Sequence, residues 1–224
     1  MNAITSLAST ITDRVASQGF YYHQEELSLD EFYEVAEMLG ETVRLDDVEL
    51  NDCPTIQFGK PAGIFWHNDG DIDIVGWNCV RQESSGGDLL LTDLRQVVSE
   101  MEPSDVEILK QTPSLCPWLS VPERKVPKRI PVISELEDTL WVNYKPRQIR
   151  PQSEAQAAAF ETLKQKVDAR GDGCYSVPIQ PRESLFVDNR RVLHCRDAIS
   201  KGSTRLLKRV LVVTDNPFNK LYGE

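Results

Sequence analysis

The stretch SLFVDNRRVLH, residues 184–194, predicts the centre of the fold. Residues 184–187 and 191–195 have the apolar composition and the length of two short buried strands, and the polar residues 188–190 predict a turn between them. The second strand carries His194, one of only three histidines in this chain of 224 residues. A histidine at the end of a core strand is often a satisfied core residue, so its role depends on what else the chain offers.

Further runs of the same kind surround this pair. Short segments bounded by Gly, Pro, Asn and Asp predict strands at residues 42–45, 55–58, 72–80, 88–92, 140–143, 175–179 and 206–213. Strands and helices do not alternate regularly, which disfavours a doubly wound parallel sheet. We therefore predict a mainly β protein with flanking helices and a double-stranded β-helix, or jelly-roll, core.

Helices are expected outside this core. The signals are an apolar helical period from Ile4 to Val15 that ends at Gly19, capping-box pairs at Ser28 and Glu31 and at Ser104 and Glu107, and a helix that begins at Ser153, with Gln156 in the box position, and ends at Gly171. Residues 113–131 hold five of the 13 prolines, which predicts a loop or lid over one end. The length fits a single domain over residues 1–224.

Composition excludes several classes of function. The formal net charge is -10, and binding to nucleic acid depends mainly on cations that neutralise phosphates, so no nucleic-acid partner is expected. The cysteines are odd in number, widely spaced and without a CxxC pair, which argues against a zinc knuckle or a disulfide framework. No apolar run approaches the roughly 20 residues that cross a bilayer, and the first residues lack a signal peptide, so we expect a cytoplasmic protein without a membrane partner.

A second histidine gives His194 a chemical context. In His67-Asn68-Asp69, residues two apart on a strand project to the same face, so His67 and Asp69 can reach one metal while Asn68 points away. Alone, such a pair is more often a hydrogen-bonded surface pair. Together with His194 it gives two imidazoles and a carboxylate, the donor set of non-heme Fe(II) oxygenases. A structural zinc site would instead use four protein ligands.

Two arginines follow on the last predicted strand. Arg205 and Arg209 share one face of an extended strand with Leu207 between them. Guanidinium groups bind carboxylates through two parallel hydrogen bonds, so the pair could hold two carboxylates beside the metal. The alternative is a solvated surface strand, which the apolar residues around the two arginines disfavour.

These motifs resemble the taurine dioxygenase and clavaminate synthase superfamily of Fe(II)/2-oxoglutarate-dependent oxygenases. The resemblance runs from about Gly19 to the end of the chain and rests on His67-Asn68-Asp69, on Gly86-Gly87-Asp88, on the strand at residues 141–144, on residues 181–194 and on residues 205–209. It implies that His67, Asp69 and His194 bind Fe(II), that O2 is consumed and that Arg205 holds the far carboxylate of 2-oxoglutarate. Many relatives have a threonine where this chain has Leu89, and Thr92 is the candidate to replace it.

The resemblance also implies an oxygenase of small molecules. A carboxylate at Asp69 argues against the related halogenases, which have a small residue there. We expect hydroxylation of a small carboxylate-bearing substrate, such as a free amino acid or a derivative, with succinate and CO2 as co-products, and Arg209, Asn78 and Asn143 are the candidate substrate-binding residues, with Arg147 nearby.

Three alternatives stay open at this point. The chain could be a catabolic dioxygenase of a sulfonate or an aryloxy acid, or a non-catalytic barrel that binds a metal or a carboxylate. A metal-dependent hydrolase is weaker, because it needs a general base near the metal and the chain has no HExxH motif. Desaturation or ring formation, and the oligomeric state, are not decided by the sequence.

Overall fold

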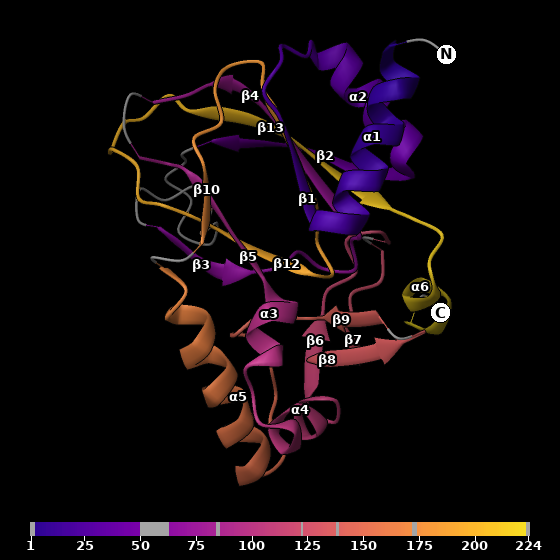
Figure 1. Ribbon diagram of the computed structural model, residues 1–224, viewed down its shortest axis with the longest axis vertical. Helices are drawn as coiled ribbons and strands as arrows, with labels where there is room; N and C mark the ends of the chain where they lie inside the picture. Colours follow the sequence, from indigo (N-terminus) through magenta and orange to yellow (C-terminus); the bar gives the residue numbers. More distant parts are fainter. Residues whose placement is uncertain are drawn as a thin grey trace.

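Two antiparallel sheets pack face to face in the computed structural model, which describes residues 3–49, 63–83, 86–121, 123–137, 139–171 and 174–222 (Figure 1). The larger sheet has the order β1 (Phe20–His23), β11 (Ser184–Asp188), β4 (Ile74–Arg81), β13 (Leu206–Val213) and β2 (Glu41–Glu49). The smaller sheet has the order β10 (Tyr175–Val177), β5 (Leu89–Asp93), β12 (Val192–Arg196) and β3 (Ile64–His67). Every pairing in both sheets is antiparallel.

The alternation of side chains along the strands builds the layers. On β13, Leu207 and Leu211 pack into the cluster between the sheets, whereas Val210 and Val212 pack against the outer helices. On β12, Val192 joins the same inner cluster, and Leu193 belongs to the core on the outer side of the smaller sheet. Because residues two apart share a face, Arg205 and Arg209 follow Leu207 inward, and His194 follows Val192.

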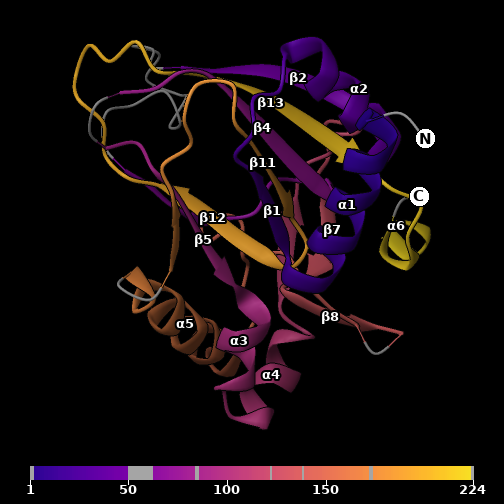
Figure 2. The same cartoon turned by 45° about the horizontal axis from the view of Figure 1, so that its top comes forward.

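Helices cover the outer face of each sheet. Helices α1 (Ala3–Gln18) and α2 (Leu29–Leu39) lie on the larger sheet, where Ile11 and Phe32 pack against Phe186 and Val210 (Figure 2). Helices α3 (Leu94–Ser99), α4 (Pro103–Leu109) and α5 (Glu154–Asp168) lie below the smaller sheet and share its outer core. No helix in the described part of the chain is both long and apolar enough to cross a bilayer.

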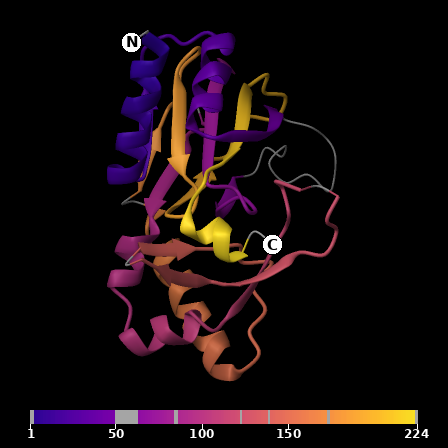
Figure 3. The same ribbon diagram turned by 90° about the vertical axis from the view of Figure 1, so that its right-hand side faces the viewer.

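Two small hairpins extend from this end of the molecule. They are β6 (Pro113–Cys116) with β7 (Lys128–Pro131), and β8 (Ile133–Leu136) with β9 (Thr139–Val142). The short C-terminal helix α6 (Pro217–Tyr222) lies beside them, with Phe218 stacked on Trp141 (Figure 3). The proline-rich stretch is therefore not a continuous loop, because its two ends pair as strands.

The structure confirms two of the predicted helix caps and corrects a third. The capping box of Ser28 and Glu31 is formed at α2, and Ser153 caps α5 by accepting a hydrogen bond from the Gln156 N–H. The box at Ser104 is wrong, since α4 begins one residue earlier at Pro103, whose missing N–H suits a first helical turn. Helix α3 was not predicted, because its six residues are too few for a helical period. The strand predicted at 55–58 lies outside the described residues.

Candidate metal centre

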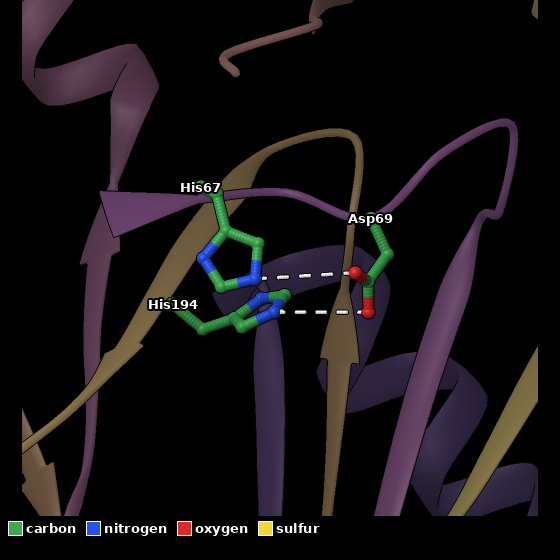
Figure 4. Close-up of side chains that lie close together, drawn as sticks. All are labelled: His67, Asp69 and His194. Atoms are coloured by element: carbon green, nitrogen blue, oxygen red, sulfur yellow. Dashed lines mark ion pairs between the residues drawn. The ribbon is translucent and has the colours of Figure 1, made fainter. Parts of the chain in front are cut away.

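Three side chains with metal-binding donors converge between the sheets. The ligand atoms of His67, Asp69 and His194 all lie within 4.8 Å of one another. The Nε2 atoms of His67 and His194 each lie 3.9 Å from an oxygen of the Asp69 carboxylate, one from Oδ1 and the other from Oδ2 (Figure 4). Both rings therefore present the same nitrogen to the space in front of the carboxylate.

The two histidines come from neighbouring strands. His67 is the last residue of β3 and is the direct cross-strand partner of His194 on β12, with ring centroids 4.5 Å apart. The Nδ1 atom of His67 lies 2.9 Å from the Phe65 carbonyl oxygen, so this nitrogen carries the proton and Nε2 is left with its lone pair. The Trp77 and His194 rings pack edge to face, with centroids 5.1 Å apart and an interplanar angle of 73°.

Asp69 is positioned differently from the prediction. Strand β3 ends at His67, so strand alternation does not bring Asp69 to the histidines. Instead Asn189, fully buried in the turn after β11, holds the Asp69 backbone: its Oδ1 accepts from the Asp69 N–H at 2.8 Å and its Nδ2 donates to the Asp69 carbonyl at 2.7 Å. A second bond from Asn189 Nδ2 reaches the Ile72 carbonyl. No local sequence pattern singles out Asn189 as a residue of the site.

The Asn189→Ala variant should lose stability and metal affinity together. It removes the Asn189 partner of the Asp69 N–H and of two carbonyls, at about 1–3 kcal/mol for each group left unsatisfied, so we expect a loss of about 3 kcal/mol or more in the free energy of unfolding. Urea unfolding and an Fe(II) titration measure the two effects. Unchanged Fe(II) affinity in Asn189→Ala would contradict the positioning role.

Burial and charge set the protonation of the three groups. Burial, together with a smaller contribution from the neighbouring His67 and against the attraction of Asp69, lowers the pKa of His194 to about 3. Burial also lowers the pKa of His67. For Asp69, burial alone would raise the pKa, but the Arg209 guanidinium and the two imidazoles outweigh it and hold the pKa below its usual range. Neutral imidazoles and an ionised carboxylate are the forms that bind a metal.

The buried His194 should make the metal-free protein sensitive to acid. Its pKa is 6.5 in the unfolded chain and about 3 in the folded protein, so only the unfolded state takes up the proton between these values. The stability that the neutral ring contributes is complete above pH 6.5 and is lost as the pH falls towards 3. Denaturant unfolding at a series of pH values measures the free energy of unfolding against pH. Its slope between pH 3 and pH 6.5 should be smaller for His194→Gln than for the wild type, and equal slopes would contradict this account.

The donor set fits a ferrous ion. Two neutral imidazoles and one carboxylate on one side leave the remaining positions of a six-coordinate ion open to other ligands. A closed structural zinc site would need a fourth protein donor, and within the described ranges no other His, Cys, Asp or Glu joins the group.

A cavity of about 380 Å³ opens in front of these ligands. Its wall includes both predicted arginines. Arg209 donates from Nη1 to Asp69 Oδ2 at 3.0 Å and from Nη2 to Asp46 Oδ2 at 2.6 Å. Arg205 is 3% exposed, donates from Nε to Gln82 Oε1 at 2.9 Å, and its Nη2 is buried without a hydrogen-bond partner among the described residues.

Three other predicted residues are not brought to this cavity. Thr92 lies on the opposite face of β5 from Leu89 and lines a separate hollow, whereas Leu89 itself lines the cavity. Asn78 donates to the Leu27 carbonyl and to Ser184 Oγ, and Asn143 donates to the Pro131 carbonyl and accepts from Arg190. These two buried amides tie the scaffold together. Arg147, in contrast, does line the cavity.

Comparisons with known proteins give a family match and structures of similar fold. Residues 40–211 match the family described as "Taurine catabolism dioxygenase TauD, TfdA family". An asparagine oxygenase in complex with Fe(II), 2S,3S-3-hydroxyasparagine and succinate has a similar structure, with a TM-score of 0.75 and 17% identity over 94% of this chain and 80% of that chain.

A second protein is similar at the same level. The non-heme iron oxygenase OrfP, in complex with Fe and alpha-ketoglutaric acid, has a TM-score of 0.74 and 15% identity over 96% of this chain and 82% of that chain. No curated protein sequence matches the chain. At such low identity these likenesses show the fold alone.

The family match covers most of the chain, so the protein belongs to the TauD/TfdA dioxygenase family. It is a non-heme Fe(II)/2-oxoglutarate-dependent dioxygenase.

Proposed function

We propose that this dioxygenase hydroxylates a small carboxylate-bearing substrate, such as a free amino acid or a derivative, and releases succinate and CO2. The observation that carries the proposal is the single cavity that holds the His67, Asp69 and His194 donors together with Arg205 and Arg209. A volume of about 380 Å³ lies near the lower end of the roughly 300–1,000 Å³ typical of ligand pockets, which suits a small substrate next to a co-substrate.

The residues of the chain divide the work. His67, Asp69 and His194 hold the Fe(II), which supplies the activation of O2 when it is bound. Arg205 holds the far carboxylate of 2-oxoglutarate. Its Nε donates to the neutral Gln82, and its buried Nη2 has no hydrogen-bond partner among the described residues, so it can donate to a bound carboxylate. Arg209 keeps Asp69 ionised and, as a lining residue of the cavity, contacts the substrate.

The surrounding fold serves these roles. The two facing antiparallel sheets are those of a double-stranded β-helix, in which the inner faces carry the ligands. The loop between β6 and β7 acts as a lid, since Pro117 and Leu119 from this loop line the cavity and Leu119 packs against Gly70 beside the metal ligands. Such a lid would exclude water from the reacting groups.

Similar proteins point to an amino acid as the substrate. The asparagine oxygenase is described with hydroxyasparagine and succinate, and OrfP has also been solved with Fe, succinate and (3S)-hydroxy-L-Arg. The family description instead names taurine catabolism, so a sulfonate is the second candidate. A non-catalytic barrel is disfavoured, because a carboxylate clamp beside three metal donors has no use without a co-substrate.

Two measurements on the pure protein test the proposal. Addition of Fe(II) and 2-oxoglutarate without oxygen should give a lilac absorption band, which reports the chelate. With oxygen and ascorbate, a panel of amino acids, with taurine as the comparison, should then give substrate-dependent succinate release. Metal binding with neither the absorption band nor oxygen consumption would contradict the proposed function and would favour a metal-binding protein without turnover.

A further inference from the structure

Part of the cavity wall is formed by a loop, residues 144–149, that is hydrogen-bonded directly to the metal-ligand segment. Asn68, between His67 and Asp69, donates its N–H to the Tyr144 carbonyl at 3.1 Å and accepts from the Tyr144 N–H at 3.0 Å. Its Nδ2 also donates to the Val142 carbonyl at 2.6 Å. Lys145, which follows Tyr144 in the chain, is thereby held beside the metal ligands, and it lines the cavity.

The loop continues as a tight turn with a second cation. The Gln148 and Ile149 N–H groups donate to the Lys145 carbonyl, and the Gln148 carbonyl accepts from Leu115, so the turn is anchored at both ends. Arg147 lies within it, with its guanidinium 5.1 Å from the centre of the Phe65 ring, on the strand that carries His67. Arg147 and Lys145 therefore reach the same cavity from one rigid turn.

Neither cation has an ionic partner in the described part of the chain. No carboxylate there lies within ion-pair distance of the Lys145 ammonium or the Arg147 guanidinium, although other cations near the cavity are paired, such as Arg44 and Arg209 with Asp46. Burial lowers the pKa of Lys145, which marks its charge as partly desolvated. A bound anion beside it would offset that cost.

The charge around the cavity is strongly one-sided for an acidic chain. Among the described lining residues, Asp69 is the one carboxylate. Six cations contribute to the wall, namely Arg44, Lys145, Arg147, Arg196, Arg205 and Arg209. The two carboxylates of 2-oxoglutarate balance the charge of Fe(II), and Asp46 and Asp69 each neutralise one guanidinium. Positive charge remains in excess, most clearly at Lys145 and Arg147. A zwitterionic neutral amino acid brings no net charge to offset this excess, whereas an acidic amino acid does.

Resting on the proposed function, we propose that the primary substrate is an amino acid with an anionic side chain, of the aspartate or glutamate class, and that Lys145 and Arg147 bind its side-chain carboxylate. The turn that carries them fixes this carboxylate at a set distance from the metal ligands. Lys145 and Arg147 thus determine specificity for the side chain of the substrate, and they are distinct from Arg205, which holds 2-oxoglutarate.

Matched substrate pairs test this assignment. Aspartate is compared with asparagine, and glutamate with glutamine, because each pair differs by one charge at nearly constant size. With the Fe(II)-loaded enzyme and 2-oxoglutarate, at least one acid should give a kcat/KM for succinate release about 10-fold or more above its amide, the effect of one partly desolvated ion pair. Calorimetry on the same loaded enzyme without oxygen should rank the four ligands in the same order.

Variants identify the residues responsible. Lys145→Gln and Arg147→Gln should each reduce the preference for the acid, mainly through KM, and the double variant should abolish it. Arg147→Lys retains the charge and should keep most of the preference, which separates a charge effect from misfolding. Arg14→Gln, on the exposed face of α1, is the matched control and should leave the preference unchanged.

The outcomes distinguish a failure of the acidic-substrate assignment from a failure of the proposed function. Equal or better turnover or binding with the amides, or no binding of either class, overturns the acidic-substrate assignment. If 2-oxoglutarate still forms its anaerobic complex with Fe(II) in that case, the proposed function survives. If that complex also fails to form, the proposed function fails with it.

Discussion

Asp69→Ala should reduce substrate-dependent succinate formation to background. Of the three donors facing the cavity, Asp69 contributes the only negative charge, and both histidines lie 3.9 Å from its carboxylate. Without it, two imidazoles remain beside the Arg209 guanidinium, which then repels a divalent cation instead of pairing with the carboxylate. Fe(II) affinity should therefore fall steeply along with turnover, as an Fe(II) or Co(II) titration would measure.

A control variant separates the loss of a ligand from the disturbance of Arg209. Arg209 has two carboxylate partners, Asp69 and Asp46. Asp46→Asn removes the other partner and leaves the three metal donors intact, so it should retain Fe(II) binding. If Asp69→Ala turned over normally, or if Asp46→Asn lost the metal equally, the assignment of Asp69 as a ligand would have to be given up.

Local patterns in the sequence predicted the elements that frame the site. The apolar runs at residues 184–187 and 191–195 are β11 and β12. Arg205, Leu207 and Arg209, which the sequence predicts on one face, all line the cavity. These features depend on residues close together in the chain, where the two-residue period of a strand decides which side chains face the core. The capping box at Ser28 is of the same local kind.

The position of Asp69 depended on contacts that no local pattern carries. Its backbone is held by Asn189, which lies 120 residues further along the chain. The pair His67 and Asp69 looks like strand neighbours in the sequence, but the strand ends at His67, and a buried amide in the turn after β11 does the positioning. A possible signal was the polar turn at residues 188–190 between two apolar strands, since a fully buried polar side chain must find hydrogen-bond partners.

The misplaced candidates have a related explanation. The sequence suggests Asn78 and Asn143 because they are polar residues near the predicted pocket strands, yet buried amides more often satisfy backbone groups than ligands. Thr92 was chosen by its closeness in sequence to Leu89, but an offset of three residues on a strand leads to the opposite face. Lys145 and Arg147 lie after a strand, in a turn whose course no periodicity predicts.

Arg205→Ala should weaken 2-oxoglutarate binding by about 100-fold, the usual scale for truncating one member of a buried charge pair. Arg205 is a buried residue of the cavity wall, and burial together with repulsion from Arg196 lowers its pKa to about 10. A carboxylate bound there would relieve both costs. Gly87 makes room for the side chain, since a Cβ at this position would lie 3.1 Å from Arg205 Cδ.

The measurement is a titration of the anaerobic Fe(II) complex with 2-oxoglutarate, followed by the KM for 2-oxoglutarate in turnover. Arg205→Lys keeps the charge but loses the two-pronged geometry, so its affinity should fall between those of the wild type and Arg205→Ala. Lys208→Ala is the control on the same strand, because Lys208 faces the other way and pairs with Asp47. Should Arg209→Ala lose 2-oxoglutarate affinity while Arg205→Ala keeps it, the two arginines exchange roles: Arg209 would anchor the co-substrate, and the buried guanidinium of Arg205 would have to be satisfied by the substrate instead.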